Sequence, residues 1–434
     1  MDPVLVALIG LLGMFALMVV GMPIAFAMLL AGLAGNAYML SGGAATHLLA
    51  TNVWEQFSSY GLSVIPLFVL MGQFAYRSGT TERLYDTAYK WVGQWPGGLA
   101  GTTIAASAGF SAICGSNSAT TAMMGTIALP EMKRYRYDPA LSAGTVAIGG
   151  TLGVVIPPSV VLIVIAVQTE QSLLRLFLAA IVPGIVLTAL FILTILAMCS
   201  RKPALGPAGP ATSLREKLAS LGGVVDTLLL FLLVIVGMYA GLFTPTEAGA
   251  AGAFGALVIG VVRRRLTLQG MIASCGETLR ISSMVVLMIT GAVVFGRFLT
   301  VTRLPFDLAD WAAALPVAPS VIMLVVLGIY VVGGMFMDAL GFLVVTLPIF
   351  FPLAAALGFD PVWYTVLLTL VTTMGAVTPP VGVNVFIVNG MAPDIPISTI
   401  FRGVAYFLLA YALCIGAIVL FPDIVLLVPR LMLG

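Results

Sequence analysis

Two proline pairs, Pro157-Pro158 and Pro379-Pro380, lie inside long apolar stretches of the chain, and a glycine stands four residues before each pair. Proline lacks a backbone N–H and its ring clashes with the preceding turn, so an α-helix cannot pass through such a pair unbroken. Backbone carbonyl groups just before each pair therefore lose their amide partners. Carbonyl oxygens freed in this way can coordinate a small, hard cation. The two pairs thus predict two cation sites at interrupted helices.

Residues next to each predicted interruption supply oxygen atoms of a kind that suits Na⁺. A proton relay needs ionisable side chains inside the membrane, and the chain offers few of them. We therefore expect the bound ion to be Na⁺, acting as the ion that is coupled to transport, and we expect no organic cofactor. The ligands predicted for the first sodium site are Ser111, Gly153, Ile156 and Pro157. The ligands predicted for the second sodium site are Gly334, Gly375, Thr378 and Val381.

A polar run of small residues, 109–121, separates two apolar arms and contains the sequence Gly115-Ser116-Asn117-Ser118. Ser and Asn favour the start of a helix, where free N–H groups attract an anion. Helix packing through Ser and Thr explains one or two such residues, but not an uninterrupted run of them. We therefore expect this run to form a hairpin tip that binds substrate. The predicted substrate contacts are Ser116, Asn117, Ser118, Asp338 and Asn384.

No Lys or Arg lies within either predicted tip or broken segment, so a substrate carboxylate would meet helix N-termini and amides there. The four cysteines have no metal-ligand spacing, and His47 lies in a polar loop with no catalytic partner nearby. These features argue against an enzyme. The formal net charge of +2 gives no indication of nucleic-acid binding.

The composition is that of a polytopic membrane protein. Hydrophobic residues make up 61% of the 434-residue chain and charged residues 8%, with a mean hydropathy of +1.14. Soluble domains carry about 25% charged residues. A helix that spans a bilayer needs about 20 apolar residues. The predicted spans are 4–20, 24–40, 60–76, 139–168, 176–199, 224–242, 247–262, 280–296, 363–391 and 402–421.

The two halves of the chain repeat the same order of signals. Pro157 lies 134 positions after Pro23, and Pro379 lies 134 positions after Pro245. Stretches 98–130 and 318–357 fit a single span poorly and are predicted to be re-entrant helical hairpins. The predicted organisation is a first repeat (1–199, hairpin 98–130, broken helix 139–168), a cytoplasmic linker (200–223) and a second repeat (224–434, hairpin 318–357, broken helix 363–391).

Charge placement predicts the orientation of the repeats, because cytoplasmic loops carry an excess of Lys and Arg. Basic residues gather at 77–90, 133–136, 201–217 and 263–265, which we expect in the cytoplasm. The loop 41–58 has no Lys or Arg, and the segment 168–172 has Glu170 as its only charge, so both are expected outside, as is the N-terminus. The first half then enters from outside and the second from inside. The predicted fold class is an all-α polytopic membrane protein with two inverted repeats, each with a re-entrant hairpin and a broken helix.

Several motifs resemble the large membrane subunit of the tripartite ATP-independent periplasmic (TRAP) transporters. They are Gly21 to Phe26, Ser111 to Thr121, Gly150 to Ser159, Phe243 to Ala248, Gly334 to Asp338 and Val377 to Asn384. The resemblance covers nearly the whole chain and implies an elevator-type, sodium-coupled importer of organic anions such as sialic acid or C4-dicarboxylates. It implies a multi-pass location in the cytoplasmic (inner) membrane of a bacterium or archaeon, in contact with membrane lipid. It also implies two protein partners, a small four-helix membrane subunit and a soluble periplasmic substrate-binding protein.

Other transport mechanisms remain open at the level of sequence. A stand-alone Na⁺- or H⁺-coupled anion permease with a related inverted-repeat hairpin fold would show the same signals. A channel would not need two occluding hairpins. The identity of the organic anion, the sodium stoichiometry and the oligomeric state are not encoded in these patterns.

Overall fold

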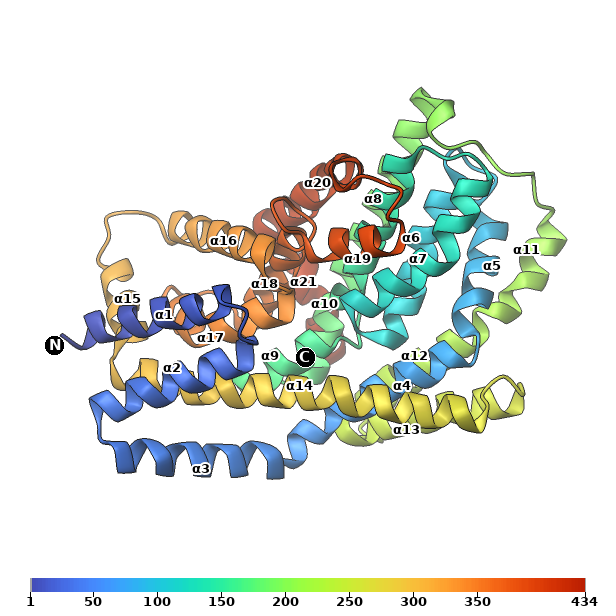
Figure 1. Ribbon diagram of the computed structural model, residues 1–434. Helices are drawn as coiled ribbons and strands as arrows, with labels where there is room; N and C mark the ends of the chain where they lie inside the picture. Colours follow the sequence, from blue (N-terminus) through green and yellow to red (C-terminus); the bar gives the residue numbers. More distant parts are fainter. Residues whose placement is uncertain (1, 434) are drawn as a thin grey trace.

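The structure is a computed structural model that describes residues 2–433, and helices dominate that range (Figure 1). The first half contains α1 (Pro3–Val19), α2 (Ile24–Met39), α3 (Gly42–Ser58), η1 (Tyr60–Ser63), α4 (Val64–Arg77), α5 (Thr80–Val92), α6 (Gly98–Cys114), α7 (Asn117–Arg134), α8 (Pro139–Val155), α9 (Val160–Thr169) and α10 (Leu173–Arg201). The short helices η2 (Pro203–Leu205), α11 (Leu214–Ser220) and η3 (Leu221–Gly223) lead to the second half.

The second half repeats much of this order. It contains α12 (Val225–Tyr239), α13 (Pro245–Val262), α14 (Leu268–Val301), α15 (Leu304–Ala313), α16 (Pro319–Phe336), α17 (Ala339–Ala356), α18 (Pro361–Gly375), α19 (Val383–Met391), α20 (Ile397–Leu420) and α21 (Asp423–Leu433). The antiparallel pair α6–α7 has its counterpart in α16–α17, and the interrupted pair α8–α9 has its counterpart in α18–α19. One difference is that α3 and α4 meet at a bend of 50°, whereas the corresponding α14 is one 34-residue helix.

Among residues 2–433, seven helices are long and apolar enough to cross a membrane, or nine if each of two bent pairs forms one span. One of these candidate spans, Pro139–Thr169, contains the interruption between α8 and α9. The chain is therefore a multi-pass membrane protein, as its composition predicts.

Two groups of helices position the candidate site. The long α14 packs against α2 and α4, and α13 packs against α4. Gly32 of α2 permits the first contact, because a Cβ there would lie 2.9 Å from the backbone of Phe295. In the second group α8 is buried along almost its whole length and packs against α6, α7 and α20. Figure 1 shows α14 along the lower edge, beside α3, and the group around α6, α7 and α8 at the right.

Some predicted bounds are wrong. Residues 42–58, expected as part of a loop, form α3, which includes His47. The hydroxyl of Ser41 caps this helix by accepting a hydrogen bond from Ala44 N at 3.2 Å. The first hairpin does not end at Pro130, because α7 continues to Arg134 with that proline inside it. Membrane helices tolerate such prolines when neighbouring groups satisfy the freed carbonyl.

Other elements have no counterpart in the predicted spans. The helices α5 and α15 connect the early helices of each half to the hairpins, and α21 ends the described chain. All three are short and contain charged residues, so an apolar window of about 20 residues does not detect them. The stretch 280–296 is the central part of the longer α14, whose polar first turns extend beyond the apolar window.

Candidate ion and substrate site

The first interruption lies between α8 and α9 and is buried. The helix α8 ends at Val155, and α9 begins at Val160 after its capping residue Ser159. The amide of Val160 donates a hydrogen bond to the carbonyl of Gly115 at 3.1 Å. Since Gly115 lies at the turn between α6 and α7, this bond ties the first hairpin tip directly to the first interruption.

Two buried hydroxyls lie on the hairpin that faces this interruption. Ser111 on α6 and Thr120 on α7 are fully buried, and neither Oγ has a hydrogen-bond partner within residues 2–433. Gly153 brings α8 close to the tip, since a Cβ there would lie 2.7 Å from Thr120 Oγ1 and would clash with the Ser116 carbonyl. An unpaired buried hydroxyl normally costs free energy, so each such atom calls for an explanation.

A cation would account for these unpaired atoms. The structure places the predicted ligand Ser111 on the hairpin next to the interruption that contains Ile156 and Pro157. Thr120 was not among the predicted ligands, although it lies within the polar run that the sequence identifies. The sequence feature that could have identified Thr120 is its spacing of one helical turn from Ser116. Ser116 caps α7, and its carbonyl accepts a hydrogen bond from the Thr120 amide at 3.0 Å.

The second interruption is longer and more exposed. The helix α18 ends at Gly375, and α19 begins at Val383. The amide of Gly382 donates a hydrogen bond to the carbonyl of Met335 at 3.1 Å, so the second hairpin is also tied to its interruption. Gly334 and Gly375 pack closely, because a Cβ on Gly375 would lie 2.8 Å from Gly334 Cα.

The other two residues predicted for the second sodium site lie in the interruption itself. The hydroxyl of Thr378 donates a hydrogen bond to the carbonyl of Met374 at 2.7 Å, and Val381 is half-buried. The Thr378 oxygen keeps its lone pairs for a cation, but its orientation is already set by the helix end. A cation here would therefore depend more on backbone oxygens than one at the first interruption.

A direct hydrogen bond joins the two halves between the interruptions. Asn384 Nδ2 donates to Asn117 Oδ1 at 2.6 Å and to the carbonyl of Ala147 at 2.9 Å. Both asparagines are buried, and Asn117 Nδ2 and Asn384 Oδ1 have no partner in the described part of the chain. Two of the five predicted substrate residues thus present one free donor and one free acceptor.

The remaining three predicted substrate residues have other surroundings. Ser116 caps α7 by accepting a hydrogen bond from Ala119 N at 3.4 Å, and Asp338 caps α17 by accepting one from Leu340 N at 3.1 Å. Ser118 is exposed in the first turn of α7. Helix capping by Ser116 and Asp338 is enough to explain why Ser and Asp occur at these two positions.

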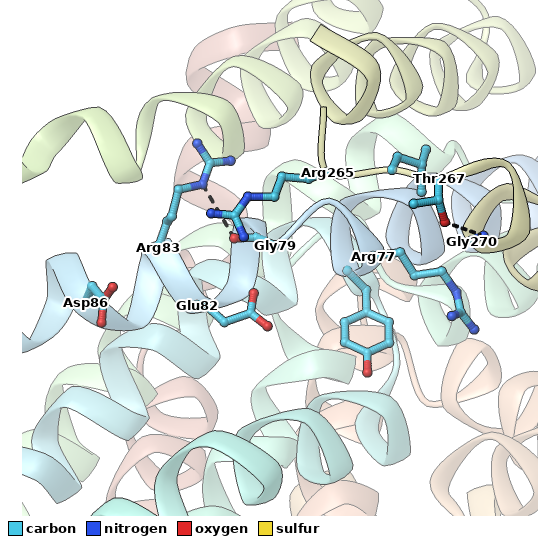
Figure 2. Close-up of a pocket in the computed structure, with 10 residues that line it drawn as sticks. Arg77, Gly79, Glu82, Arg83, Asp86, Arg265, Thr267 and Gly270 are labelled. Carbon is cyan, nitrogen blue, oxygen red and sulfur yellow. Dashed lines mark hydrogen bonds between the residues drawn. The ribbon is translucent and has the colours of Figure 1, made fainter. Parts of the chain in front are cut away.

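A separate cavity of about 570 Å³ lies at the elbow between α4 and α5 (Figure 2). Arg77, Arg83 and Arg265 line it together with Glu82 and Asp86. Arg83 Nε donates to the carbonyl of Gly79 at 3.4 Å, and Arg83 also forms an ion pair with the buried Asp226 of α12. Burial raises the pKa of the Asp86 carboxyl above its ordinary value, while Lys90 opposes this shift. The positive charges of the arginines around this cavity are therefore largely offset by the negative charges of nearby carboxylates.

The sequence relationships agree with this arrangement. Residues 11–424 match the family model described as the DctM component of the tripartite ATP-independent periplasmic transporters. The chain belongs to this family. It is therefore the large membrane subunit of a TRAP transporter and not an enzyme.

Named relatives in this family differ in the substrate that their names give. The chain is 35% identical to a C4-dicarboxylate TRAP transporter large permease of Pseudomonas aeruginosa, covering 88% of this chain and 89% of the relative. It is 32% identical to a sialic acid large permease of Vibrio cholerae, covering 98% and 99%. It is 31% identical to a 2,3-diketo-L-gulonate large permease of Escherichia coli, covering 94% and 95%.

Solved transporter structures share the fold at low sequence identity. The YdaH transporter of Alcanivorax borkumensis aligns with a TM-score of 0.66 and 15% identity over 98% of this TRAP subunit and all of that chain. The antimetabolite efflux pump MtrF of Neisseria gonorrhoeae aligns with a TM-score of 0.56 and 13% identity, covering 87% and 85%.

Proposed function

We propose that this TRAP subunit couples the inward movement of Na⁺ to the import of an organic anion across the cytoplasmic membrane. The transported anion would be a carboxylate of the size of a C4-dicarboxylate or a sialic acid. The alternative is a stand-alone Na⁺- or H⁺-coupled permease. The observation that carries the proposal is the pair of unpaired, fully buried hydroxyls, Ser111 and Thr120, next to an interrupted helix.

The proposed sodium sites use the two tips and the two interruptions. In the first site the hydroxyls of Ser111 and Thr120 would combine with backbone oxygens of Gly153, Ile156 and Pro157. In the second, backbone oxygens of Gly334, Gly375 and Val381 would combine with Thr378. Neutral oxygen ligands suit Na⁺, because their dipoles can replace its hydration shell without a buried carboxylate.

The substrate would bind between the two sodium sites. Asn117 and Asn384 offer it a free donor and a free acceptor, and Ser116, Ser118 and Asp338 lie at the adjoining helix starts. An anion at these helix starts would be stabilised by free N–H groups and by the positive ends of the helix dipoles. Bound Na⁺ would add positive charge nearby. This arrangement would make anion binding depend on sodium.

The proposed motion is an elevator movement of one domain against another. Hairpins α6–α7 and α16–α17 with the two interrupted helices would form the transport domain. Helices α1, α2, α4, α12, α13 and α14 would form the scaffold. The two halves would then be inverted repeats with the N-terminus in the periplasm. We also propose that a small four-helix membrane subunit and a periplasmic substrate-binding protein complete the transporter.

A sodium-titration experiment tests the proposal. The subunit is reconstituted into proteoliposomes with a small TRAP membrane subunit and a periplasmic binding protein from the same organism, and uptake of succinate, N-acetylneuraminate and 2,3-diketo-L-gulonate is measured under an inward sodium gradient. We expect saturable uptake of one of them that requires sodium and the binding protein. Uptake that is independent of sodium contradicts the coupling. Full uptake without the binding protein supports the stand-alone permease.

A further inference from the structure

A second cavity of about 530 Å³ opens where four elements meet, α3, α9, α14 and α17. Its polar lining consists of Gln56, Ser59, Gln168, Thr169, Glu170, Arg297 and Thr300. The segments 41–58 and 168–172 are those that the charge pattern places outside the cytoplasm. The cavity therefore lies between the proposed scaffold and the proposed transport domain, on the side from which substrate would arrive.

The guanidinium of Arg297 is available for a ligand in this cavity. Arg297 is exposed, and no carboxylate oxygen lies within 4.0 Å of its guanidinium among residues 2–433. Glu170 lines the same cavity and is also exposed, at the end of α9. The buried Gln168 Oε1 has no hydrogen-bond partner in the described residues. The cavity thus has a free cation and an unpaired amide oxygen.

The cavity differs chemically from the inner substrate site. The tips and interruptions contain no Lys or Arg, so an anion there depends on neutral groups and on bound Na⁺. A guanidinium binds a carboxylate through two parallel hydrogen bonds and is always charged. A cation in a cleft also raises the local concentration of anions and the rate of their association.

We infer that the Arg297 cavity is an outer binding site that holds the carboxylate of the organic anion before it reaches the hairpin tips. This inference rests on the proposed function, because it assumes an anionic substrate that arrives from outside. Arg297 takes the carboxylate, while Gln168 and Gln56 supply hydrogen bonds to the rest of the molecule. Glu170 competes for Arg297 and limits the affinity, so that the anion can leave toward the inner site.

A labelling experiment measures binding at this site separately from transport. A thiol is introduced by Thr300→Cys in a Cys275→Ser background, since Cys275 is the one exposed cysteine among the described residues. The protein is reconstituted with its small subunit, without a sodium gradient. The rate of labelling by a methanethiosulfonate is measured against the concentrations of succinate, N-acetylneuraminate and 2,3-diketo-L-gulonate. The site should be protected by at least one of these acids.

The variants give expected changes of opposite sign. For the protecting acid, Arg297→Gln should raise the half-protecting concentration about tenfold, the loss of about 1.4 kcal/mol. Arg297→Lys should recover part of the effect, and Glu170→Gln should lower the half-protecting concentration. Arg303→Gln is the matched control, because Arg303 is exposed at the same end of α14 and does not line the cavity. Asn117→Ala removes a contact of the proposed inner site, so protection that arises at the outer site should persist in this variant.

Two results would overturn the inference. One is protection by none of the three acids, and the other is protection that persists unchanged in Arg297→Gln but disappears in Asn117→Ala. Either result leaves the proposed function standing if sodium-dependent uptake of one acid is observed. Conversely, protection that requires Arg297 supports the outer site even if uptake proves independent of sodium.

Discussion

The two interrupted helices begin from the same sequence device but differ in their surroundings. At the first, Pro157 and Pro158 are buried, and the adjoining hairpin carries two buried hydroxyls that have no partner within residues 2–433. At the second, Pro379 and Pro380 are exposed, and the hydroxyl of Thr378 already bonds to a backbone carbonyl. Both interruptions are tied to a hairpin by one backbone hydrogen bond. The proline pair therefore determines that a helix stops, whereas the packing determines how many side-chain oxygens are available to an ion.

The largest effects should come from the glycines that the two interruptions share. Gly153→Ala places a methyl group against the Ser116 carbonyl and Thr120, and Gly375→Ala places one against the Val331 carbonyl and Gly334. Backbone atoms cannot move aside cheaply, so each variant should lose about 1–3 kcal/mol of stability. Uptake should fall to background in both. Thermal unfolding and proteoliposome uptake measure the two effects.

Gly390→Ala is the matched control for these glycines. Gly390 lies in α19, close in sequence to the second interruption, and no described atom lies within 4 Å of a Cβ placed there. Its stability and uptake should resemble those of the unmodified protein. If Gly153→Ala transports normally, the close approach of α8 to the first tip is not needed for function.

Next in size is the loss of the hydrogen bond that joins the halves. Asn384→Ala removes the donor to Asn117 and to the Ala147 carbonyl; it leaves the buried Asn117 Oδ1 unpaired, whereas the Ala147 carbonyl lies inside α8 and keeps its helical hydrogen bond. Unpaired buried groups cost about 1–3 kcal/mol each, so the midpoint of thermal unfolding should fall clearly. Asn389→Ala, which removes a half-buried bond to the Ile395 carbonyl, should lower it less. Equal shifts of the unfolding temperature in the two variants would show that the buried hydrogen bond between the halves contributes no more to stability than the half-buried one.

The two proposed sodium sites should respond unequally to loss of a hydroxyl. Ser111→Ala should raise the sodium concentration for half-maximal uptake about tenfold, and Thr378→Val about threefold, because about 1.4 kcal/mol corresponds to a factor of ten. The larger effect is expected at Ser111, since its oxygen has no other partner in the described chain. Sodium titration of uptake measures both. Thr126→Val, which alters an exposed hydroxyl of α7, is the control. A larger effect at Thr378 would show that the hydroxyl of the second proposed site contributes more to sodium affinity than the hydroxyl of Ser111.

The smallest effect should come from the ion pair that links the two halves at the surface. Lys133 Nζ lies 2.6 Å from Asp394 Oδ2, and both side chains are mostly exposed. Lys133 holds the pKa of the Asp394 carboxyl below its ordinary value. The contribution of the pair to stability is therefore present above the ordinary pKa of Asp and is lost as the pH falls through the lowered value. Lys133→Gln should change the unfolding temperature little at neutral pH, and any difference from the unmodified protein should vanish in acid and in high salt. A large shift at neutral pH would show that the pair fixes the halves together.

The helical fold and its interruptions follow from local features of the sequence. Prolines, apolar runs and capping residues affect the backbone within a few residues, so the ends of α8 and α18 can be predicted from the sequence alone. The same reasoning failed for α3, α5 and α15, which are not apolar enough to resemble spans. It also placed the end of the first hairpin at Pro130, where neighbouring helices allow α7 to continue.

The features of the candidate site also fall into two groups, those set by local sequence and those set by the packing of distant helices. The sequence by itself determined that two helices stop, that small polar residues lie at a tip, and that the inner site has no basic side chain. Only the tertiary structure decided that Asn384 meets Asn117 across 267 positions, that the Thr120 hydroxyl has no partner within residues 2–433, and that Arg297 lines a cavity between α9, α14 and α17. Backbone chemistry acts over a few residues, whereas these contacts depend on how distant helices pack, which local sequence does not specify.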